Sequence, residues 1–329
     1  MTIIRIPAAE WAELERAHQQ RADALTAAWR GRRLTGETHA VDDFLFTYYP
    51  YKPSLLRRWH PGAGVALEHA AALDRAIYKW YRTDDAGASL VDAAGMLDAR
   101  GSTIGFIERL LGSTAARPAQ FGCFGLHEWA MVYRLAPGEV RHEALGLRLS
   151  ADETDRVVEA NHIACSHFDA FRFFTRDAVG LNTMSPSREN QEFTEQAGCL
   201  HAGMDVYKWA IKLGPLVPGD LLLDSFELAR DIRQLDMQAS PYDVSEFGLT
   251  PVAIETRAGK VEYAARQRAF AARSNALRAR VLECIARARS VTHSRPALSA
   301  EVDAGPAVVA EAFDGVSGRA GGRRLAVRV

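Results

Sequence analysis

The stretch AGMDVYKWAIKLGPLVPGDLLLDSFELARDIRQLDMQA, residues 202–239, contains two helical patterns that are separated by a sharp break. The break falls at Gly214 and Pro215, two residue types that commonly stand just beyond the end of a helix. We therefore predict one helix over residues 202–214 and a second helix over residues 219–239.

The second of these patterns carries acidic side chains on one side and apolar side chains on the other. Such a stripe of carboxylates also occurs on metal-binding helices of the di-iron type. The opposing apolar stripe favours the simpler interpretation, in which the acids form a solvated face. The acids are Asp220, Asp224, Glu227 and Asp231, and the apolar residues are Leu221, Leu228, Ile232 and Leu235.

The rest of the chain adds further helical patterns and a region of strand-like composition. SADETDRVVEA has Ser150 and Glu153 at the positions of a capping box, which predicts a short helix. Strands are predicted in LHEWAMVYRL, EALGLRL and NHIACSHFDAFRFF, between residues 121 and 180. The fold class is therefore predicted to be α+β, predominantly α-helical, with a small central strand-containing region. Further helices are predicted near residues 1–30, 66–82, 103–112 and 259–290.

Composition also predicts how the chain is divided. Residues 1–290 are expected to form a single globular domain, whose functional centre lies between residues 120 and 210. Residues 291–329 are rich in Gly, Ala, Pro and Ser and have no sustained period, so we expect them to form a flexible C-terminal tail.

The bulk properties exclude several classes of protein. With a net charge of -1 the chain has no overall attraction to nucleic acid, so such binding would need a local patch. No run approaches the roughly 18 apolar residues of a membrane span. Four cysteines and no signal-peptide pattern favour a cytoplasmic protein without disulfides. There is no glycine-rich phosphate loop and no GxSxG motif, and nothing specifies an oligomeric state.

Three short runs place a cysteine upstream of a histidine that is followed by a carboxylate. Thiol, imidazole and carboxylate groups are the side chains that bind metals and perform acid/base catalysis. We expect the three histidines to converge around one concave pocket if the runs are functional. The alternative is that the cysteines are small core residues and the polar groups form a buried network. The runs are GCFGLHEW with Cys123, His127 and Glu128, ACSHFDAFRF with Cys165, His167 and Asp169, and GCLHAGMDVYKW with Cys199, His201 and Asp205.

Local geometry predicts which of these groups share a face. On a strand, His167 and Asp169 would lie on the same face, where the pair can orient a water, hold a metal or act as a base and its orienter. On a helix, His201 and Asp205 would share a face with Lys208. A surface ion pair on an ordinary helix is the simpler interpretation of that second trio.

Residues 44–67 contain no acid and combine aromatic with basic side chains. This mixture can stack on bases and contact phosphates at the same time, so we expect the loop to supply the substrate-binding wall of the pocket. The alternative is that the aromatic rings fill a core beneath a proline-rich loop while the arginines are solvated. The candidate substrate contacts are Tyr48, Tyr49, Tyr51, Arg57, Arg58 and Trp59, together with Arg172 and Lys208.

Several long motifs, among them FLFTYYPYKPSLLRRWHPG, FGCFGLHEWAMVYR and CSHFDAFRFFT, resemble a family of actinobacterial proteins commonly labelled 3-methyladenine DNA glycosylases. The resemblance extends over roughly residues 5–288. It implies a DNA-repair hydrolase that excises an alkylated purine from DNA. Such an enzyme flips the base into an aromatic pocket and directs water or charge at the sugar. Asp169 or Asp205 would serve the second step, positioned by His167 or His201.

These observations support three hypotheses. The first is a hydrolase that acts on a nucleobase or nucleotide, such as a DNA N-glycosylase. The second is a metal-dependent oxygenase or hydrolase whose Zn, Fe or Mn is bound by the three histidines and completed by a carboxylate. The third is a non-catalytic helical scaffold. The histidines are His127, His167 and His201, and the carboxylates are Glu128, Asp169 and Asp205.

Overall fold

The structure is a computed structural model that describes residues 2–135 and 145–293. These residues belong to one compact unit that spans residues 1–294. They form a predominantly helical α+β fold with one small mixed sheet, so the predicted fold class is confirmed. The tail expected over residues 291–329 lies outside the described residues from residue 294 onward.

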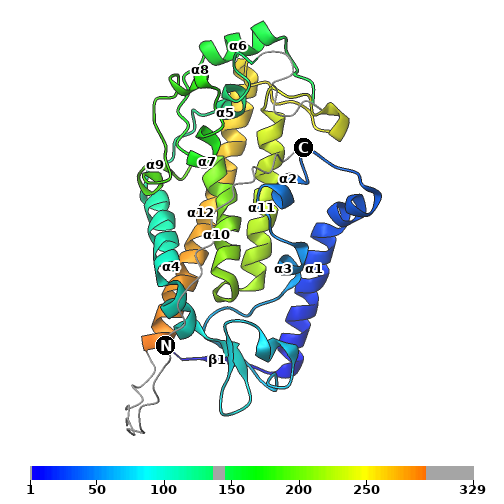
Figure 1. The fold of residues 1–329 in the computed structure, drawn as a ribbon, viewed down its shortest axis with the longest axis vertical. Coiled ribbons are helices and arrows are strands. Elements are labelled where there is room, and N and C mark those ends of the chain that lie inside the picture. Colours follow the sequence, from blue (N-terminus) through cyan, green and yellow to red (C-terminus); the bar gives the residue numbers. More distant parts are fainter. Residues whose placement is uncertain (1, 136–144, 294–329) are drawn as a thin grey trace, which may run out of the picture. The chain divides into compact units, whose positions relative to one another are not determined.

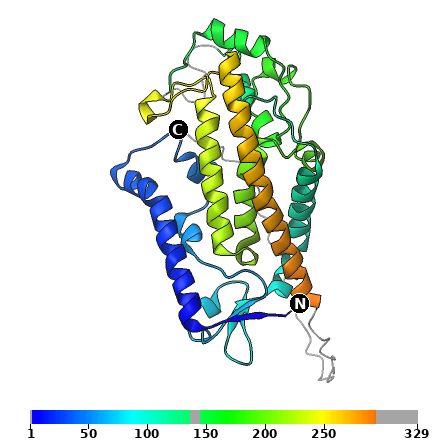
Figure 2. The same cartoon turned by 180° about the vertical axis from the view of Figure 1, so that it is seen from behind.

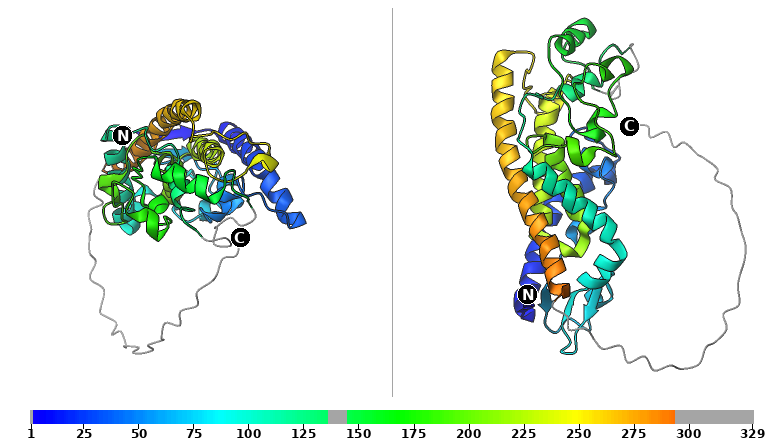
Figure 3. Two further views of the ribbon diagram at one scale, coloured as in Figure 1. Left: turned by 90° about the horizontal axis from the view of Figure 1, so that it is seen from above. Right: turned by 90° about the vertical axis from the view of Figure 1, so that its left-hand side faces the viewer.

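Four helices pack side by side and form the centre of the unit (Figure 1). They are α4 (Ala93–Ala116), α10 (Leu200–Leu213), α11 (Gly219–Gln238) and α12 (Arg257–His293). The predicted helices over residues 202–214 and 219–239 correspond to α10 and α11, which a single turn at Gly214–Leu216 connects into an antiparallel pair. Seen from the side, α12 runs along the whole length of this pair (Figure 3).

The long N-terminal helix α1 (Ala8–Thr35) packs against α11 on the side away from α4 (Figure 2). The acidic stripe of α11 faces arginines there. Asp224 lies 2.7 Å from Nη2 of Arg21 on α1 and 2.9 Å from Nη1 of Arg280 on α12. The stripe predicted to be a solvated face is therefore a line of half-exposed ion pairs that connects three helices.

This arrangement predicts that Asp224→Asn lowers the free energy of unfolding by about 1 kcal/mol, since half-exposed pairs contribute little individually. The loss of stability should be smaller in 1 M salt, where the Debye screening length is about 3 Å. Urea denaturation at low and high salt measures both effects. Glu262→Gln, which breaks a pair within α12 alone, is the matched control and should change stability less. A loss that does not depend on salt would contradict an electrostatic role.

The strands form a four-stranded sheet at the end of the unit where α1 begins (Figure 1). They are β1 (Ile4–Ile6), β2 (Val65–Leu67), β3 (Tyr81–Thr83) and β4 (Ser89–Val91), in the order β1-β2-β4-β3. β1 runs parallel to β2, and the other neighbours are antiparallel. Since Ile4 pairs with Val65, the sheet is built from residues far apart in the sequence.

The helix predicted over residues 66–82 is wrong, because this segment supplies β2, a 3-10 turn at Asp74–Ile77 and the start of β3. Its composition is rich in Ala, but His69 and Trp80 have φ values of 57° and 72°. Left-handed backbone at two points cannot belong to one right-handed helix.

The strands predicted between residues 121 and 180 are also wrong. The described part of this region holds short helices and two isolated bridges, Leu147 with Tyr242 and Ile163 with Asn182. All five residues of α5 are buried, and a buried apolar run has the same composition in a helix as in a strand. The capping box of α6 is confirmed. The helices of this region are α5 (Leu126–Ala130), α6 (Ala151–Glu159), α7 (Phe168–Phe171) and α8 (Arg176–Val179), and another short helix, α9 (Gln191–Thr194), follows it.

His60, next to the sheet, gives the fold a pH dependence. Burial, together with the nearby cations Arg75 and Arg58, lowers the pKa of His60 to about 3, and its Nδ1 lies 2.8 Å from the hydroxyl oxygen of Tyr81. In the unfolded chain His60 binds a proton near pH 6.5, whereas in the folded chain it stays neutral down to about pH 3. The free energy of unfolding therefore decreases as pH falls below 6.5.

We expect the wild type to lose about 2 kcal/mol more stability than His60→Gln between pH 7 and pH 4, measured by urea denaturation. This value is below the full linkage energy because the ring is only partly shielded from solvent. Parallel pH curves for the two proteins would show that His60 titrates normally in the fold.

The main core lies between the long helices and the short ones, and its largest fully buried side chains include Trp129, Tyr207, Phe226 and Tyr263. Within the described part of the chain, none of the helices has both the length and the apolar character that a membrane crossing requires.

Candidate functional site

Polar side chains gather inside the unit where α10 and α11 meet the short helices α5 and α7. They include two groups of three possible metal ligands, each with its donor atoms within 4.8 Å of one another. We call them the His127 centre (His127, His201 and Asp236) and the His167 centre (His167, Glu195 and Asp205). The rings of His127 and His201 lie 4.4 Å apart between centroids, and those of His167 and His201 lie 5.4 Å apart. The three histidines therefore converge as predicted, but in the interior of the unit, and they line neither of the two pockets found among the described residues.

Two members of the His127 centre, His127 and Asp236, are buried, and the side chain of the third, His201, is 13% exposed. His127 Nε2 lies 3.0 Å from Oδ1 of Asp236, whose exposed fraction is 0%. His127 lies on α5, which begins after two residues with positive φ, Phe124 and Gly125. This tight turn directs α5 into the core, so that the imidazole faces α11.

Arg233 supplies the positive charge beside this centre. Its Nη1 donates to Oδ2 of Asp236 at 2.9 Å and to Oε1 of Glu128 at 3.2 Å. Its guanidinium carbon also lies 3.9 Å from the ring centroid of Phe44, on the short helix α2 (Phe44–Thr47). Glu128, which was predicted from its place beside His127, is thus bound by an arginine from another helix.

The His167 centre is equally buried but has a connection to the surface. His167 Nε2 lies 3.3 Å from Oδ2 of Asp205 on α10 and 3.4 Å from Oε1 of Glu195. His167 is the residue before the first turn of α7, so its side chain points into the bundle while α7 turns away. Its partner is therefore not Asp169, and the strand face predicted for that pair is wrong.

Lys208 connects the His167 centre to the outside. Its Nζ donates to Oδ2 of Asp205 at 2.8 Å and to Oδ2 of Asp169 at 3.1 Å. Asp169 also accepts from Nε of Arg172 at 3.1 Å, and the side chains of Asp169 and Arg172 are 17% and 40% exposed. The order Asp205, Lys208, Asp169, Arg172 therefore leads from the interior to solvent.

The acid-free loop divides between this site and other parts of the unit. The hydroxyl of Tyr49 donates to Oδ1 of Asp205 at 2.6 Å. Burial and the nearby charges of Asp205 and Asp169 raise the pKa of Tyr48 far above its usual range. Tyr51 packs edge-on against Tyr207, with the ring centroids 6.1 Å apart.

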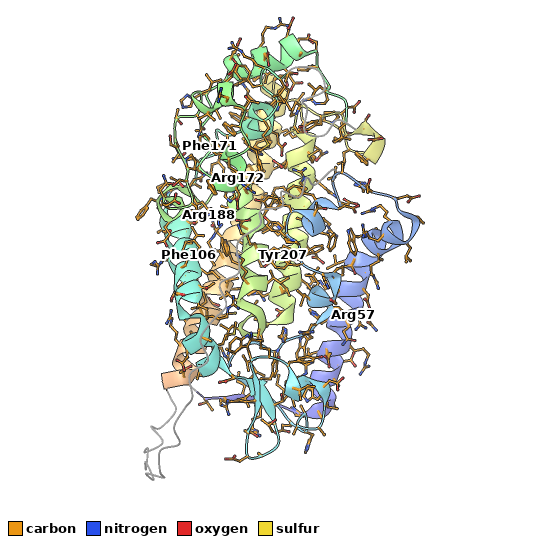
Figure 4. All side chains as sticks on the ribbon, in the orientation of Figure 1. Arg57, Phe106, Phe171, Arg172, Arg188 and Tyr207 are labelled. Carbon is orange, nitrogen blue, oxygen red and sulfur yellow. The ribbon has the colours of Figure 1, made fainter. Side chains whose placement is uncertain are left out.

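The other predicted contacts of the loop lie elsewhere. Arg57 pairs with Asp23 of α1 at 3.1 Å, and the guanidinium of Arg58 lies over the ring of Tyr78. Trp59 is buried next to Arg75. Figure 4 shows Arg57 near α1 and α3 (Pro53–Arg57), with Tyr207 between it and Arg172. The expectation that Arg57, Arg58 and Trp59 border the histidines is therefore wrong, because these side chains serve packing between α1, α3 and the sheet.

His201 lies between the two centres and differs from the other two histidines. Its Nε2 is 4.0 Å from Oδ2 of Asp236, and its ring makes no hydrogen bond with another described residue. Burial, together with the positive charge of His127, lowers the pKa of His201 to about 3. The imidazole is therefore neutral at neutral pH and keeps a free lone pair, which is the form that binds a metal or accepts a proton.

The acids of the two centres control the protonation of the other histidines. Burial alone would lower the pKa of His127, but the carboxylate of Asp236 outweighs it and raises that pKa. Burial alone would raise the pKa of both aspartates. His127 nevertheless keeps the pKa of Asp236 well below the usual range, and Lys208 does the same for Asp205. Both aspartates are therefore ionised.

The described residues of the two centres and their edge carry an excess of negative charge. Five carboxylates face three permanent cations, which leaves two negative charges if all five are ionised. A buried excess of this kind is costly. Two further protons, on His127 and His167, whose pKa values, despite burial, the neighbouring carboxylates raise, would neutralise it, and so would one divalent cation that displaces these protons. The carboxylates are Glu128, Asp169, Glu195, Asp205 and Asp236, and the cations are Arg172, Lys208 and Arg233.

The cysteines of the three runs are free thiols next to this cluster. Cys123 Sγ lies 3.9 Å from Nδ1 of His127. Burial raises the pKa of Cys199 to about 12 and also raises the pKa of Cys165 well above its usual range, so both remain protonated. They behave as small core residues.

Sequence reasoning missed three members of the cluster, Asp236, Arg233 and Glu195. A signal for two of them exists in α11. Its buried stripe Leu222, Phe226 and Ala229 continues, at the same helical spacing, with Arg233 and Asp236. Charges that extend an apolar stripe must be buried and paired. Glu195 follows α9 without any periodic pattern, so the sequence holds no comparable signal for it.

Compared with known proteins, the chain matches no family model, no curated protein and no solved structure.

Proposed function

We propose that the protein is a metal-dependent enzyme whose His127 and His167 centres bind divalent cations. One observation supports this proposal above others: six donor side chains from distant parts of the sequence form two adjacent groups within a helical bundle. Bundle proteins build metal sites in this way, from histidines and carboxylates on facing helices.

The donor types favour iron or manganese, and admit zinc. The His127 centre offers two imidazoles and one carboxylate, the set typical of non-haem iron oxygenases. The His167 centre offers one imidazole and two carboxylates. Because His201, at 13%, is the most exposed side chain of the His127 centre, a small molecule such as dioxygen suits this centre better than a polymer. We therefore favour an oxygenase, and a metal-dependent hydrolase is the alternative class.

Each neighbouring residue then has a role. Arg233 donates to Oδ2 of Asp236, and Tyr49 donates to Oδ1 of Asp205. Each hydrogen bond fixes the orientation of the carboxylate and of its remaining lone pairs. Such outer contacts orient metal ligands. Lys208 and Arg172 lie on the route to the surface, where they can bind an anionic part of a substrate.

Addition of Fe²⁺ under anaerobic conditions, followed by oxygen, tests the class. An oxygenase should consume oxygen with Fe²⁺ and not with Zn²⁺. Binding of Zn²⁺ or Mn²⁺ without any oxygen consumption by the Fe²⁺ form would favour the hydrolase. Failure to bind any of these metals would leave the cluster as the buried network of a scaffold.

A nucleobase- or nucleotide-directed hydrolase, including the DNA glycosylase implied by the resemblance, is the second candidate. The accessible carboxylate Asp169 favours it. This group is held between two cations, and the short helix α7 that carries it also carries Phe168 and Phe171. A carboxylate in this position can stabilise positive charge that develops on a sugar.

For the nucleobase-directed hydrolase, Asp169→Asn should lower turnover by about a hundredfold, the usual size of a general-base or charge-stabilising contribution. Oxygen uptake by a metal-dependent oxygenase should change less, since Asp169 belongs to neither centre. The variant should keep its stability within about 1 kcal/mol because the side chain is partly exposed. Release of methylated adenine from alkylated DNA, and oxygen uptake, are the two assays. Asp177→Asn, at an exposed site on α8, is the matched control. Unchanged turnover with a lower melting temperature would show that Asp169 only stabilises the fold.

A further inference from the structure

An open groove of about 480 Å³ lies outside the cluster, between the first turns of α12 and the segment before α5. Its walls are basic and apolar, and no carboxylate of the described residues lines it. A groove of this volume is large enough for a small organic ligand. The lining residues are Phe124, Arg257, Lys260, Val261, Ala264 and Arg268.

The three cations of the groove are not neutralised by the described acids near them. Lys260 donates to the amide oxygen of Asn161 at 2.6 Å, and the guanidinium of Arg268 lies 5.1 Å from the ring centroid of Phe121. Neither contact supplies a negative charge. Glu255, which precedes α12, is bound by both terminal nitrogens of Arg148. Three like charges therefore face one groove, where their combined potential attracts anions.

Phe124 is held in the groove by strained backbone. Its φ of 47° is rare for a bulky residue, and it is followed by Gly125 with a φ of 72°. Such a conformation costs about 1–3 kcal/mol and persists where the surroundings impose it. It places the ring 5.7 Å from Nζ of Lys260 and 6.2 Å from the ring of Tyr263, which closes the groove on its inner side.

We infer that this groove binds a small phosphomonoester that carries a flat aromatic ring. Two guanidinium groups and an ammonium group match the charge and the several oxygens of a phosphate. The partly buried ring of Phe124, which lines the groove, provides a surface on which an aromatic group can stack. This site stands independently of the metal centres and of the proposed enzyme class.

Calorimetric titration of the full chain with adenosine monophosphate, adenosine and inorganic phosphate tests the inference. Adenosine monophosphate should bind more tightly than either of the others, with an affinity that falls as salt rises. Lys260→Gln and Arg268→Gln should each weaken its binding roughly tenfold, the loss expected for one charge-assisted contact. Phe124→Leu should weaken binding of adenosine monophosphate and leave that of phosphate unchanged.

Arg266→Gln is the matched control, because Arg266 lies on the same stretch of α12 but contacts Glu262 and Gln238 outside the groove. Its affinity for adenosine monophosphate should equal that of the wild type. Equal binding of adenosine and its monophosphate would overturn the phosphate assignment, as would an equal loss in all three charge variants. Equal binding of phosphate and adenosine monophosphate would overturn the aromatic part, and no binding at millimolar concentration would overturn the whole inference.

Discussion

Replacing Asp236 with Asn should lower the free energy of unfolding by about 3–5 kcal/mol, the largest loss we expect from a single substitution. The carboxylate is fully buried and accepts from Arg233 at 2.9 Å, while His127 lies 3.0 Å away. Asparagine keeps the volume but removes the charge, which leaves two buried cationic groups with poorer compensation. Breaking a buried ion pair on one side typically costs this amount.

Urea denaturation, with the slope compared between variants, measures this loss. The control is Asp231→Asn, on the same helix, where a half-exposed carboxylate pairs with Arg230 and Arg273. That change should cost no more than about 1 kcal/mol. Equal losses for the two variants would mean that the charge of Asp236 makes no special contribution.

Replacing His201 with Ala should lower affinity for Fe²⁺ or Zn²⁺ by more than about a hundredfold. A metal site with a binding free energy of about 10–16 kcal/mol over four ligands loses about 3 kcal/mol with each ligand. His201 suits this test because its ring makes no hydrogen bond with another described residue, so its removal disturbs few structural contacts. Competition with a chromophoric chelator measures the affinity.

His162 provides the control for this experiment, since it is exposed and lies outside both centres. His162→Ala should bind metal like the wild type. If His201→Ala is stably folded and also binds metal like the wild type, His201 is not a ligand, and the His127 centre loses one of its three donors.

Local signals in the sequence predicted the long helices well. The break at Gly214 and Pro215, together with the spacing of apolar residues, predicts where α10 and α11 begin and end without information from the rest of the chain. The sheet could not be predicted in this way, because β1 pairs with β2 some 60 residues later. The Ala-rich stretch that forms β2 and its turn therefore looked helical.

The candidate site shows the same division between local and distant contacts. The convergence of His127, His167 and His201 was predicted because the three runs share one type of chemistry. The partner of His167 was not, since the structure supplies Asp205 from another helix in place of the neighbouring Asp169. Pairing across helices depends on packing, which spacing within one run does not specify.

The metal content of the purified protein distinguishes a metal-dependent enzyme from a buried structural network. Inductively coupled plasma mass spectrometry after desalting should find between one and two equivalents of iron, manganese or zinc, since two adjacent centres are present. Metal-depleted protein should take up the same amount on titration, and His201→Ala should not. A protein that contains no metal, and binds none of these three on titration, would contradict the account and leave the histidines as part of a buried structural network.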